Sequence, residues 1–313
     1  MQVLLTGSFG FVGSNLLQTI KSAFNCKLIA IDIYESRTHI FDEFYSWDYL
    51  DKVDWKKVDI IIHLAGKAHD TSVQTRTDEY FEINTSLTQR IYNFFLGSNA
   101  KKFIFFSSVK SVADKVEGEM LTECVLPNPK GPYGESKIAA ENYILANLPK
   151  KKQVYILRPC MIHGPGNKGN LNLLYKIVAK GIPWPLGAYD NKRSFCSIDN
   201  LSFVIHNIIE NNIESGIYQV ADDEPLSTNE LVELIATSIY KKARIWKISR
   251  STIHRLAKSG DILHLPLNTE RLRKLTENYV VSNEKLKKAL GIEKLPVSVK
   301  DGILNTLESF RLK

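Results

Sequence analysis

The sequence has no long hydrophobic run. Nowhere in its 313 residues do ~18 apolar residues follow one another, which is the length that a membrane-spanning helix needs. The N-terminus has no basic segment before an apolar stretch, because the strand-like run Gln2–Leu5 begins at once. We therefore expect no signal peptide, no membrane partner and a cytoplasmic location.

Cysteine is scarce as well. The four cysteines stand at positions 26, 124, 160 and 196, so none has a neighbour at the spacing of a metal-binding cluster. Each lies beside apolar or strand-like sequence, which predicts buried free thiols in a reducing cytoplasm. We expect no metal site.

No charged run dominates the sequence. The formal net charge is +7, and the share of hydrophobic residues (44%) and of charged residues (24%) is ordinary for a globular protein. A basic balance favours an anionic partner. The cations are scattered, and the densest runs, Lys150–Lys152 and Lys285–Lys288, are typical of solvated surface. Since nothing resembles a basic recognition helix or an aromatic stacking platform, we expect an anionic small ligand and no nucleic acid.

Short apolar runs alternate with helical periodicity over the first 160 residues. The runs are apolar on both faces, as strands between two helix layers are: Val3–Leu5, Leu28–Ile31, Ile60–Leu64, Phe103–Phe106 and Val154–Leu157. Apolar residues recur with a helical period in Val12–Ala23, Thr85–Leu96 and Tyr133–Ala146. The alternation predicts an α/β fold with a doubly wound parallel sheet of roughly seven strands.

The composition and the pattern of the sequence change after Pro159. Glycine and proline become frequent, and shorter helical stretches follow at Leu171–Lys180, Ser227–Tyr240 and Asn283–Leu290. We expect residues 1–160 to form the sheet domain, with residues 190–212 returning to it. Residues 161–313 are expected to form mainly a smaller region, with the substrate cleft between the two.

A glycine-rich segment, Thr6–Gly13, joins the first strand to the first helix. Gly7 permits the tight turn, Gly10 lets the backbone approach a pyrophosphate, and Gly13 lets the helix pack closely on the strand. The free N–H groups of the helix N-terminus favour phosphate. The segment therefore predicts a dinucleotide site.

An acidic residue follows the glycine segment at the expected distance. Asp32 ends the second strand, 19 residues after Gly13, where a carboxylate accepts hydrogen bonds from the adenosine ribose and repels a 2′-phosphate. This favours NAD over NADP, although Arg37 lies close enough to weaken the preference. Residues 1–160 are thus expected to be an NAD-binding Rossmann domain.

A tyrosine and a lysine stand four residues apart and share one helix face. They are Tyr133 and Lys137, and Pro132 before them can start the helix. Ser107 and Ser108 end a strand, where the ligand crevice of such a sheet opens. A nearby ammonium and the positive nicotinamide of NAD⁺ would favour the Tyr133 phenolate, a general base for a sugar hydroxyl, while Ser108 holds the same oxygen.

Together these residues carry a family resemblance. Thr6–Gly13, Asp32, His63–Gly66, Ser107–Ser108, Tyr133 with Lys137, and Arg158–Pro159 resemble, in this order and over nearly the whole chain, the extended short-chain dehydrogenase/reductases that act on nucleotide sugars. The stretches Ser107–Lys110, Arg158–Asn172 and Asp222–Thr228 are similar to one bacterial branch. That branch holds UDP-N-acetylhexosamine 4-epimerases and the 4-reductases that form UDP-N-acetylquinovosamine, for capsule or O-antigen synthesis.

The resemblance implies a role for each matching residue. Catalysis would rest on Tyr133, Lys137 and Ser108. NAD would contact Gly7, Phe9, Gly10, Phe11, Val12, Gly13, Asp32, Asp48, Tyr49, Leu64, Ala65, Gly66, Ser107, Tyr133, Lys137 and Pro159. Lys67, Asn84 and Ser108 would lie near the sugar, Asn170 and Leu171 near the diphosphate and uracil, and Arg193 would clamp the diphosphate with help from Arg271 or Arg273.

Some positions depart from the family pattern. His163 precedes Gly164 where tyrosine is commoner, and Val112-Ala113 replaces a usual Tyr-Gly, which we expect to affect packing or acceptor shape. Val109-Lys110 stands where sugar 4,6-dehydratases carry Asp-Glu. Without an acid to protonate the leaving hydroxyl, we do not expect dehydration.

The resemblance leaves three functions open. In a UDP-sugar 4-epimerase, Tyr133 takes the C4 hydroxyl proton, and the 4-keto sugar turns over and regains hydride on its other face. In a 4-ketoreductase, NAD(P)H delivers hydride to a UDP-4-keto-6-deoxy sugar. A redox-silent NAD-binding protein is the third, although both Tyr133 and Lys137 are present. The resemblance also implies a homodimer through two helices, Thr85–Leu96 and Ile138–Ala146.

Overall fold

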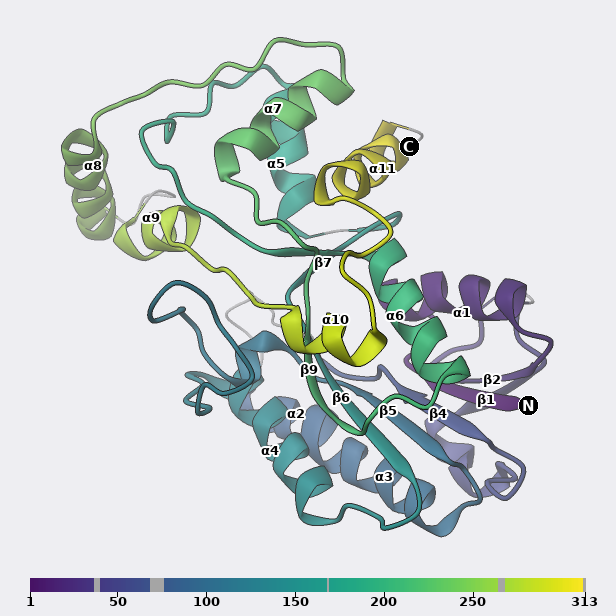
Figure 1. The fold of residues 1–313 in the computed structure, drawn as a ribbon. Coiled ribbons are helices and arrows are strands. Elements are labelled where there is room, and N and C mark those ends of the chain that lie inside the picture. Colours follow the sequence, from purple (N-terminus) through teal and green to yellow (C-terminus); the bar gives the residue numbers. More distant parts are fainter. Residues whose placement is uncertain (37–39, 68–75, 168, 264–267, 312–313) are drawn as a thin grey trace.

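A sheet of seven parallel strands lies at the centre of the computed structural model, which describes residues 1–36, 40–67, 76–167, 169–263 and 268–311 (Figure 1). The strand order is β3-β2-β1-β4-β5-β6-β9, and every neighbouring pair runs parallel. The strands are β1 Gln2–Thr6, β2 Lys27–Asp32, β3 Glu43–Ser46, β4 Ile60–His63, β5 Lys102–Phe106, β6 Gln153–Pro159 and β9 Gly216–Val220. The predicted doubly wound sheet is confirmed.

Two layers of helices cover the sheet because its strands are apolar on both faces. In β1, Val3 and Leu5 enter one hydrophobic core while Leu4 enters the other. The first core lies under α1 (Phe11–Ala23) and α6 (Ile198–Glu210), and the second under α3 (Leu87–Gly97) and α4 (Pro132–Ala146). Figure 1 shows these two pairs of helices on opposite sides of the sheet.

The helix expected at Thr85–Leu96 begins differently in the structure. A short helix α2 (Thr77–Phe81) runs through a π-helical turn η2 (Glu82–Ser86) into α3. Single π turns inside helices mark functional sites more often than chance. Here the turn carries Asn84, whose side chain is hydrogen-bonded to the Lys67 backbone in the loop after β4.

Two strands of the central sheet escaped the sequence reading. β3 is a four-residue edge strand whose side chains are only half-buried, so it has no apolar run to reveal it. β9 follows α6 and completes the sheet next to β6. Residues 198–220 therefore pack with the sheet domain, while β8 (Phe195–Ser197), which we expected to return with them, pairs with β7 (Met161–His163) in a separate two-stranded sheet.

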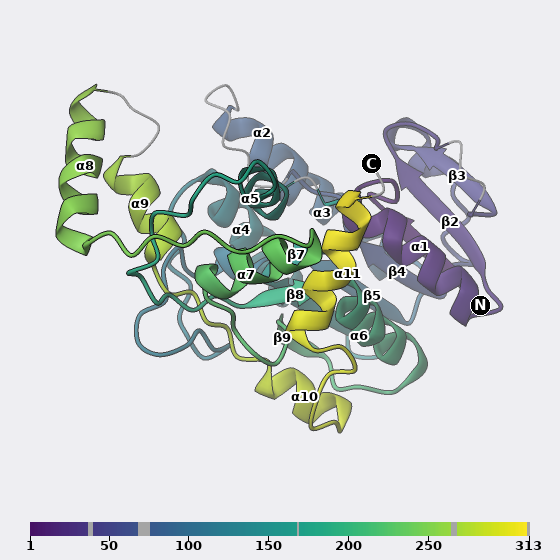
Figure 2. The ribbon, with the colours of Figure 1, turned by 90° about the horizontal axis from the view of Figure 1, so that it is seen from above.

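The C-terminal lobe has its own hydrophobic core. It contains α5 (Asn170–Ala179), α7 (Thr228–Ser238), α8 (Arg250–Leu263), α9 (Thr269–Thr276) and α11 (Val299–Arg311), while α10 (Glu284–Leu290) packs on β9. In Figure 2, seen from above, α8 and α9 lie at the end of this lobe that is farthest from α1. Within the described residues, none of the helices combines the length and the apolarity needed to cross a membrane.

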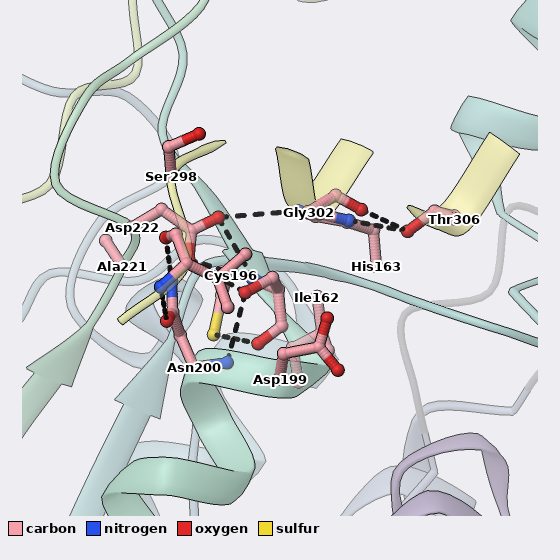
Figure 3. Close-up of polar contacts among 12 residues, drawn as sticks. Ile162, His163, Cys196, Asp199, Asn200, Ala221, Asp222, Ser298, Gly302 and Thr306 are labelled. Carbon is pink, nitrogen blue, oxygen red and sulfur yellow. Dashed lines mark hydrogen bonds and ion pairs between the residues drawn. The ribbon is translucent and has the colours of Figure 1, made fainter. Parts of the chain in front are cut away.

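A buried carboxylate joins the two lobes. Asp222, directly after β9, accepts hydrogen bonds from the Ser197 amide at 3.0 Å and from the Asn200 side-chain amide at 2.7 Å (Figure 3). His163 lies between Asp222 Oδ2, at 3.4 Å, and Thr306 Oγ1 of α11, at 2.9 Å. The unusual histidine therefore has a packing role, as we expected, at the junction of β7, β9, α6 and α11.

The four thiols are free, but they are not all buried. Cys26 and Cys196 are buried, Cys160 is half-buried and Cys124 is exposed. The prediction for Cys124 was wrong because its apolar neighbours Val125 and Leu126 are themselves exposed in the loop before α4. In the described parts of the chain, no three His, Cys, Asp or Glu side chains gather as a metal site would require.

Replacement of Asp222 tests how much this buried carboxylate contributes to the free energy of unfolding. Asp222→Ala leaves the buried Asn200 amide and the Ser197 amide without their acceptor, so we expect a loss of about 3 kcal/mol in the free energy of unfolding. Urea denaturation measures it. Asp199→Ala, an exposed aspartate of the same helix α6, should cost less than about 1 kcal/mol, and equal losses in the two variants would contradict the assignment.

Candidate active site

The glycine segment forms a tight turn between β1 and α1. Gly7 has φ +67°, and a Cβ there would lie 2.8 Å from the Ala65 nitrogen. A Cβ on Gly13 would overlap the Gly7 carbonyl oxygen. Both positions therefore require glycine, as the sequence predicts.

The N-terminus of α1 is free to bind an anion. Gly10 is its N-cap residue, so no side chain caps the first N–H groups of the helix. The ring of Phe9 packs against Phe41 and Phe44, and Val12 packs on the core. The expected contacts of Phe9, Phe11 and Val12 with the cofactor would therefore come chiefly from their backbone.

Asp32 lies at the end of β2, beside this turn. Its Oδ2 accepts a hydrogen bond from the Phe9 amide at 2.7 Å, and its Oδ1 accepts one from the Ile33 amide at 2.7 Å. Each oxygen keeps a lone pair for a ribose hydroxyl. Asp48 and Tyr49 are exposed on the 3₁₀ helix η1 (Trp47–Lys52), which follows the neighbouring strand β3, whereas Arg37 lies outside the described residues.

The end of β4 is held by a buried histidine that the sequence reading did not single out. His63 makes hydrogen bonds with Thr6 Oγ1 at 2.6 Å and with Thr88 Oγ1 at 2.9 Å. Burial lowers the pKa of His63 to about 3, so the ring is neutral at physiological pH. It links β1, β4 and α3 beneath Leu64-Ala65-Gly66, whose Leu64 amide donates to the Thr6 carbonyl.

Tyr133 begins the helix α4 and faces Ser108. Pro132 is at the start of the helix, as expected, and the Tyr133 side chain is hydrogen-bonded to the Ser108 side chain. Burial raises the pKa of Tyr133, while the Ser108 bond opposes this effect. Burial is the largest effect on the pKa of Tyr133 in the structure, so the phenolate that we expected Lys137 and the nicotinamide of NAD⁺ to favour remains a prediction.

Lys137 is buried one turn further along α4. Its Nζ donates to the Phe106 carbonyl at 3.0 Å and lies 5.1 Å from the centre of the Phe105 ring. Burial lowers the pKa of Lys137 to about 8, although Glu141 counteracts it. A Cβ on Gly66 would lie 2.8 Å from the same Nζ, so glycine at position 66 leaves the room that the lysine occupies.

Glu141 is a second buried charge on α4, and the sequence reading missed it. Its carboxylate accepts two hydrogen bonds from Arg158 Nε at 3.1 Å and one from Arg158 Nη2 at 2.5 Å. Ser111 donates to it at 2.6 Å, and Ser107 donates as well. The Ser107 hydroxyl is therefore bound to Glu141, and the cofactor contact we expected of Ser107 would come from its backbone. A charged residue on the buried face of α4 is the signal that could have revealed Glu141.

Asn84 supports the loop after β4. Its Oδ1 accepts from the Lys67 amide at 2.8 Å, and its Nδ2 donates to the Lys67 carbonyl and to Ser136 Oγ. The Lys67 ammonium pairs with Glu79 at 2.7 Å. Asn84 thus holds the backbone beside Gly66 through hydrogen bonds inside the protein, and its expected place near a sugar remains a prediction.

Two half-buried cations lie between the lobes. The Nε of Arg193 is buried without a hydrogen-bond partner among the described residues, and burial lowers the pKa of Arg193. Lys110 Nζ lies 4.5 Å from the centre of the Tyr279 ring, and its pKa is lowered by burial and further by Arg193. An unsatisfied guanidinium N–H beside a second cation fits an anion.

The other residues expected to contact the substrate or the cofactor lie on several elements. Asn170 and Leu171 do start α5, and Pro159 ends β6. Arg271 and Arg273 are exposed on α9, and Arg273 Nε lies 3.9 Å from Glu277 Oε2. Lys110, which the sequence reading treated only as a missing acid, interacts electrostatically with Arg193.

Known proteins are similar to this chain in sequence. A model of the NAD dependent epimerase/dehydratase family matches residues 3–221. A UDP-glucose 4-epimerase from Vibrio cholerae is 33% identical over 256 residues, which cover 76% of this chain and 76% of that protein. An N-acetyl-alpha-D-glucosaminyl-diphospho-ditrans,octacis-undecaprenol 4-epimerase from Escherichia coli O157:H7 is 28% identical and covers 77% of this chain and 73% of its own length.

A solved structure has the same fold. The UDP-glucuronic acid 4-epimerase from Bacillus cereus in complex with NAD superposes with a TM-score of 0.77 at 19% identity, over 99% of this chain and 96% of that chain. The shared architecture extends through the C-terminal lobe.

The buried lysine gives the unfolding free energy a specific pH dependence. Above about pH 8 Lys137 is neutral in the folded protein but remains charged when unfolded, up to its ordinary pKa of 10.5. The unfolded chain then binds more protons, so folding becomes more stable as pH rises, by about 1.4 kcal/mol per pH unit at most.

Denaturation of the cofactor-free protein at several pH values between 8 and 10 measures this slope. Lys137→Met should remove it, whereas Lys150→Met, at an exposed position, should keep it. Parallel curves for wild type and Lys137→Met would show that Lys137 is charged in the fold.

Proposed function

The chain belongs to the NAD dependent epimerase/dehydratase family, and from this premise we propose that it is a UDP-sugar 4-epimerase working through a 4-keto intermediate. It is an NAD-dependent enzyme of the epimerase/reductase type. The observation that carries the proposal is the Tyr133–Ser108 hydrogen bond at the carboxyl edge of the sheet, one helical turn from Lys137.

Tyr133 is the proposed general base for the C4 hydroxyl. Ser108 would hold the reacting oxygen in place, since it already binds the Tyr133 side chain. When bound, NAD⁺ supplies the hydride acceptor and a positive ring charge. Because burial raises the pKa of Tyr133 in the structure, the phenol would lose its proton only where positive charge is brought beside it.

Arg193 and Lys110 are the proposed anchors of the diphosphate. The buried Nε of Arg193 has no protein hydrogen-bond partner among the described residues and could donate a charge-assisted hydrogen bond, and Lys110 adds a second positive charge. A diphosphate occurs in the named substrates of both curated relatives. With the nucleotide on α5 at Asn170 and Leu171, the sugar would extend toward Tyr133.

The chain lacks the acid pair that dehydration would need. Val109 and Lys110 form the 3₁₀ turn η3 (Val109–Ser111), in which Lys110 donates to the Asp114 carbonyl at 2.8 Å. This supports turnover that returns hydride to the same carbon without loss of water. We propose further that the substrate is a UDP-hexose or a UDP-N-acetylhexosamine. The product would serve polysaccharide synthesis in the cytoplasm.

The cofactor bound to the purified protein distinguishes an epimerase from a 4-ketoreductase. An epimerase must keep its cofactor through the cycle, so denaturation should release near-stoichiometric NAD⁺, and the native protein should interconvert UDP-hexoses or UDP-N-acetylhexosamines. Chromatography of the released nucleotide and of the sugar products measures both. Protein without bound dinucleotide that oxidises NADH stoichiometrically on a UDP-4-keto-6-deoxy sugar would establish the reductase instead. The same preparation should elute as a homodimer, at twice 35.5 kDa.

Removal of the phenolic oxygen tests the base. Tyr133→Phe should lower kcat by at least about 100-fold while NAD stays bound, because the ring still fills its position and only the proton acceptor is lost. Coupled epimerase assays and nucleotide release measure the two properties. Tyr240→Phe, at an exposed tyrosine, is the matched control. Normal turnover by the Tyr133→Phe variant would refute the site.

A further inference from the structure

The excess positive charge of the chain is concentrated in one segment. The chain has 41 Lys and Arg against 34 Asp and Glu; residues 240–263, here called the basic segment, hold seven of the former and one of the latter, which leaves 34 against 33 elsewhere. Its cations are Lys241, Lys242, Arg244, Lys247, Arg250, Arg255 and Lys258. Our reading of scattered charge missed this cluster because its cations are spaced through the segment and form no run.

These seven cations are exposed and have no acidic partners. None of them forms an ion pair with a carboxylate among the residues that the structure describes, whereas surface cations elsewhere, such as Lys21 and Lys27, do. Lys241, Arg244 and Arg250 donate only to backbone carbonyls. Their charge is therefore uncompensated and available to an anionic surface.

Large apolar side chains are exposed among the cations. Tyr240 is 86% exposed and Ile262 78%, and the same segment exposes Trp246, Leu256 and Leu263. Helix α8 needs only Ile253, Ala257 and Gly260 to pack on the C-terminal lobe. Its further apolar residues are not used by the fold.

The segment lies at the outer end of the C-terminal lobe. Figures 1 and 2 show α8 at the edge of the molecule, beyond α7 and apart from the sheet. At the other end of the segment, Lys241, Lys242 and Arg244 line a hollow of about 340 Å³ together with Ile182 and Val232. None of these residues belongs to the candidate active site.

We propose that the basic segment docks the protein on the surface of an anionic phospholipid bilayer. The cations would bind lipid phosphates, and the tryptophan, tyrosine and leucine side chains would enter the interfacial layer, where aromatic and aliphatic residues beside Lys and Arg are favoured. A nucleic acid would use the cations but give no reason for exposed Leu256, Ile262 and Leu263. We expected no membrane partner because no helix spans one; peripheral docking needs no spanning helix.

The test is co-sedimentation of the full chain with vesicles. We expect binding to vesicles of phosphatidylcholine mixed with phosphatidylglycerol, no binding to phosphatidylcholine alone, and release by high salt. Wild-type protein that stays in the supernatant with the anionic vesicles at low salt would overturn the proposal. The readout is independent of turnover, so it distinguishes this inference from the proposed function.

Two variants separate the contributions of charge and apolar surface. The charge variant is Lys242→Gln, Lys247→Gln, Arg255→Gln and Lys258→Gln. Each lost cation should weaken partitioning about fivefold, equivalent to about 1 kcal/mol. The apolar variant, Leu256→Ser, Ile262→Ser and Leu263→Ser, should weaken it at least about tenfold.

Matched controls remove the same groups elsewhere. The charge control is Lys56→Gln, Lys101→Gln, Lys150→Gln and Lys151→Gln, all at exposed positions, and the apolar control is Met120→Ser, Leu126→Ser and Leu148→Ser. Both controls should bind vesicles nearly as wild type does, and all variants should keep wild-type turnover. The docking surface would be refuted if a control variant lost as much vesicle binding as its matched variant. It would also be refuted if the wild-type protein bound no vesicles but bound duplex DNA, and the charge variant lost that DNA binding.

Discussion

The buried ion pair between Arg158 and Glu141 is the interaction on which the geometry of the site depends. It joins the end of β6 to the middle of α4, and two serines, Ser107 directly after β5 and Ser111 on the turn η3, complete its hydrogen bonds. Tyr133 and Lys137 are on the same helix, two turns and one turn before Glu141, and Ser108 follows one of the two serines. The pair therefore fixes the distance between the phenol and the strand end. Such a pair contributes little net stability, but removal of one partner leaves a costly buried charge.

Buried polar side chains in this protein lie where they fix the relative positions of strands, helices and loops. His63 links two strands to α3, Asp222 links both lobes, and Asn84 holds the loop that passes Lys137. Each is nearly fully hydrogen-bonded, which makes burial tolerable. By contrast, the buried Nε of Arg193 has no hydrogen-bond partner among the described residues, and the same is true of a few other buried polar atoms such as Trp184 Nε1 and Gln219 Oε1. Arg193 differs from these in carrying a positive charge, so an anionic ligand would supply the acceptor that it lacks.

The sequence predicted the parts of the structure that local chemistry determines. Backbone geometry requires glycine at positions 7 and 13, and the four-residue spacing of Tyr133 and Lys137 places them on one helix face. Both pairs could therefore be recognised from the local sequence, without knowledge of residues distant in the chain. Glu141, His63 and Lys110 escaped because their roles depend on partners distant in the chain. Strand β9 was missed since its five residues carry little signal outside the context of β6, and Cys124 was misplaced because apolar neighbours do not guarantee burial. The roles expected for Asn170, Asp48 and the α9 arginines remain predictions.

The order in which the sheet is assembled has a consequence for synthesis. Strand β9, at residues 216–220 of 313, lies beside β6, although 56 residues that include α5 and α6 are inserted between the two strands in the chain. While the ribosome makes this insertion, β6 has an unpaired edge, and unpaired edges invite association with other chains. The nascent chain cannot close its sheet until about two thirds of it has been translated. The two lobes must therefore mature together, and a genetic cut between them would yield an N-terminal fragment prone to aggregate.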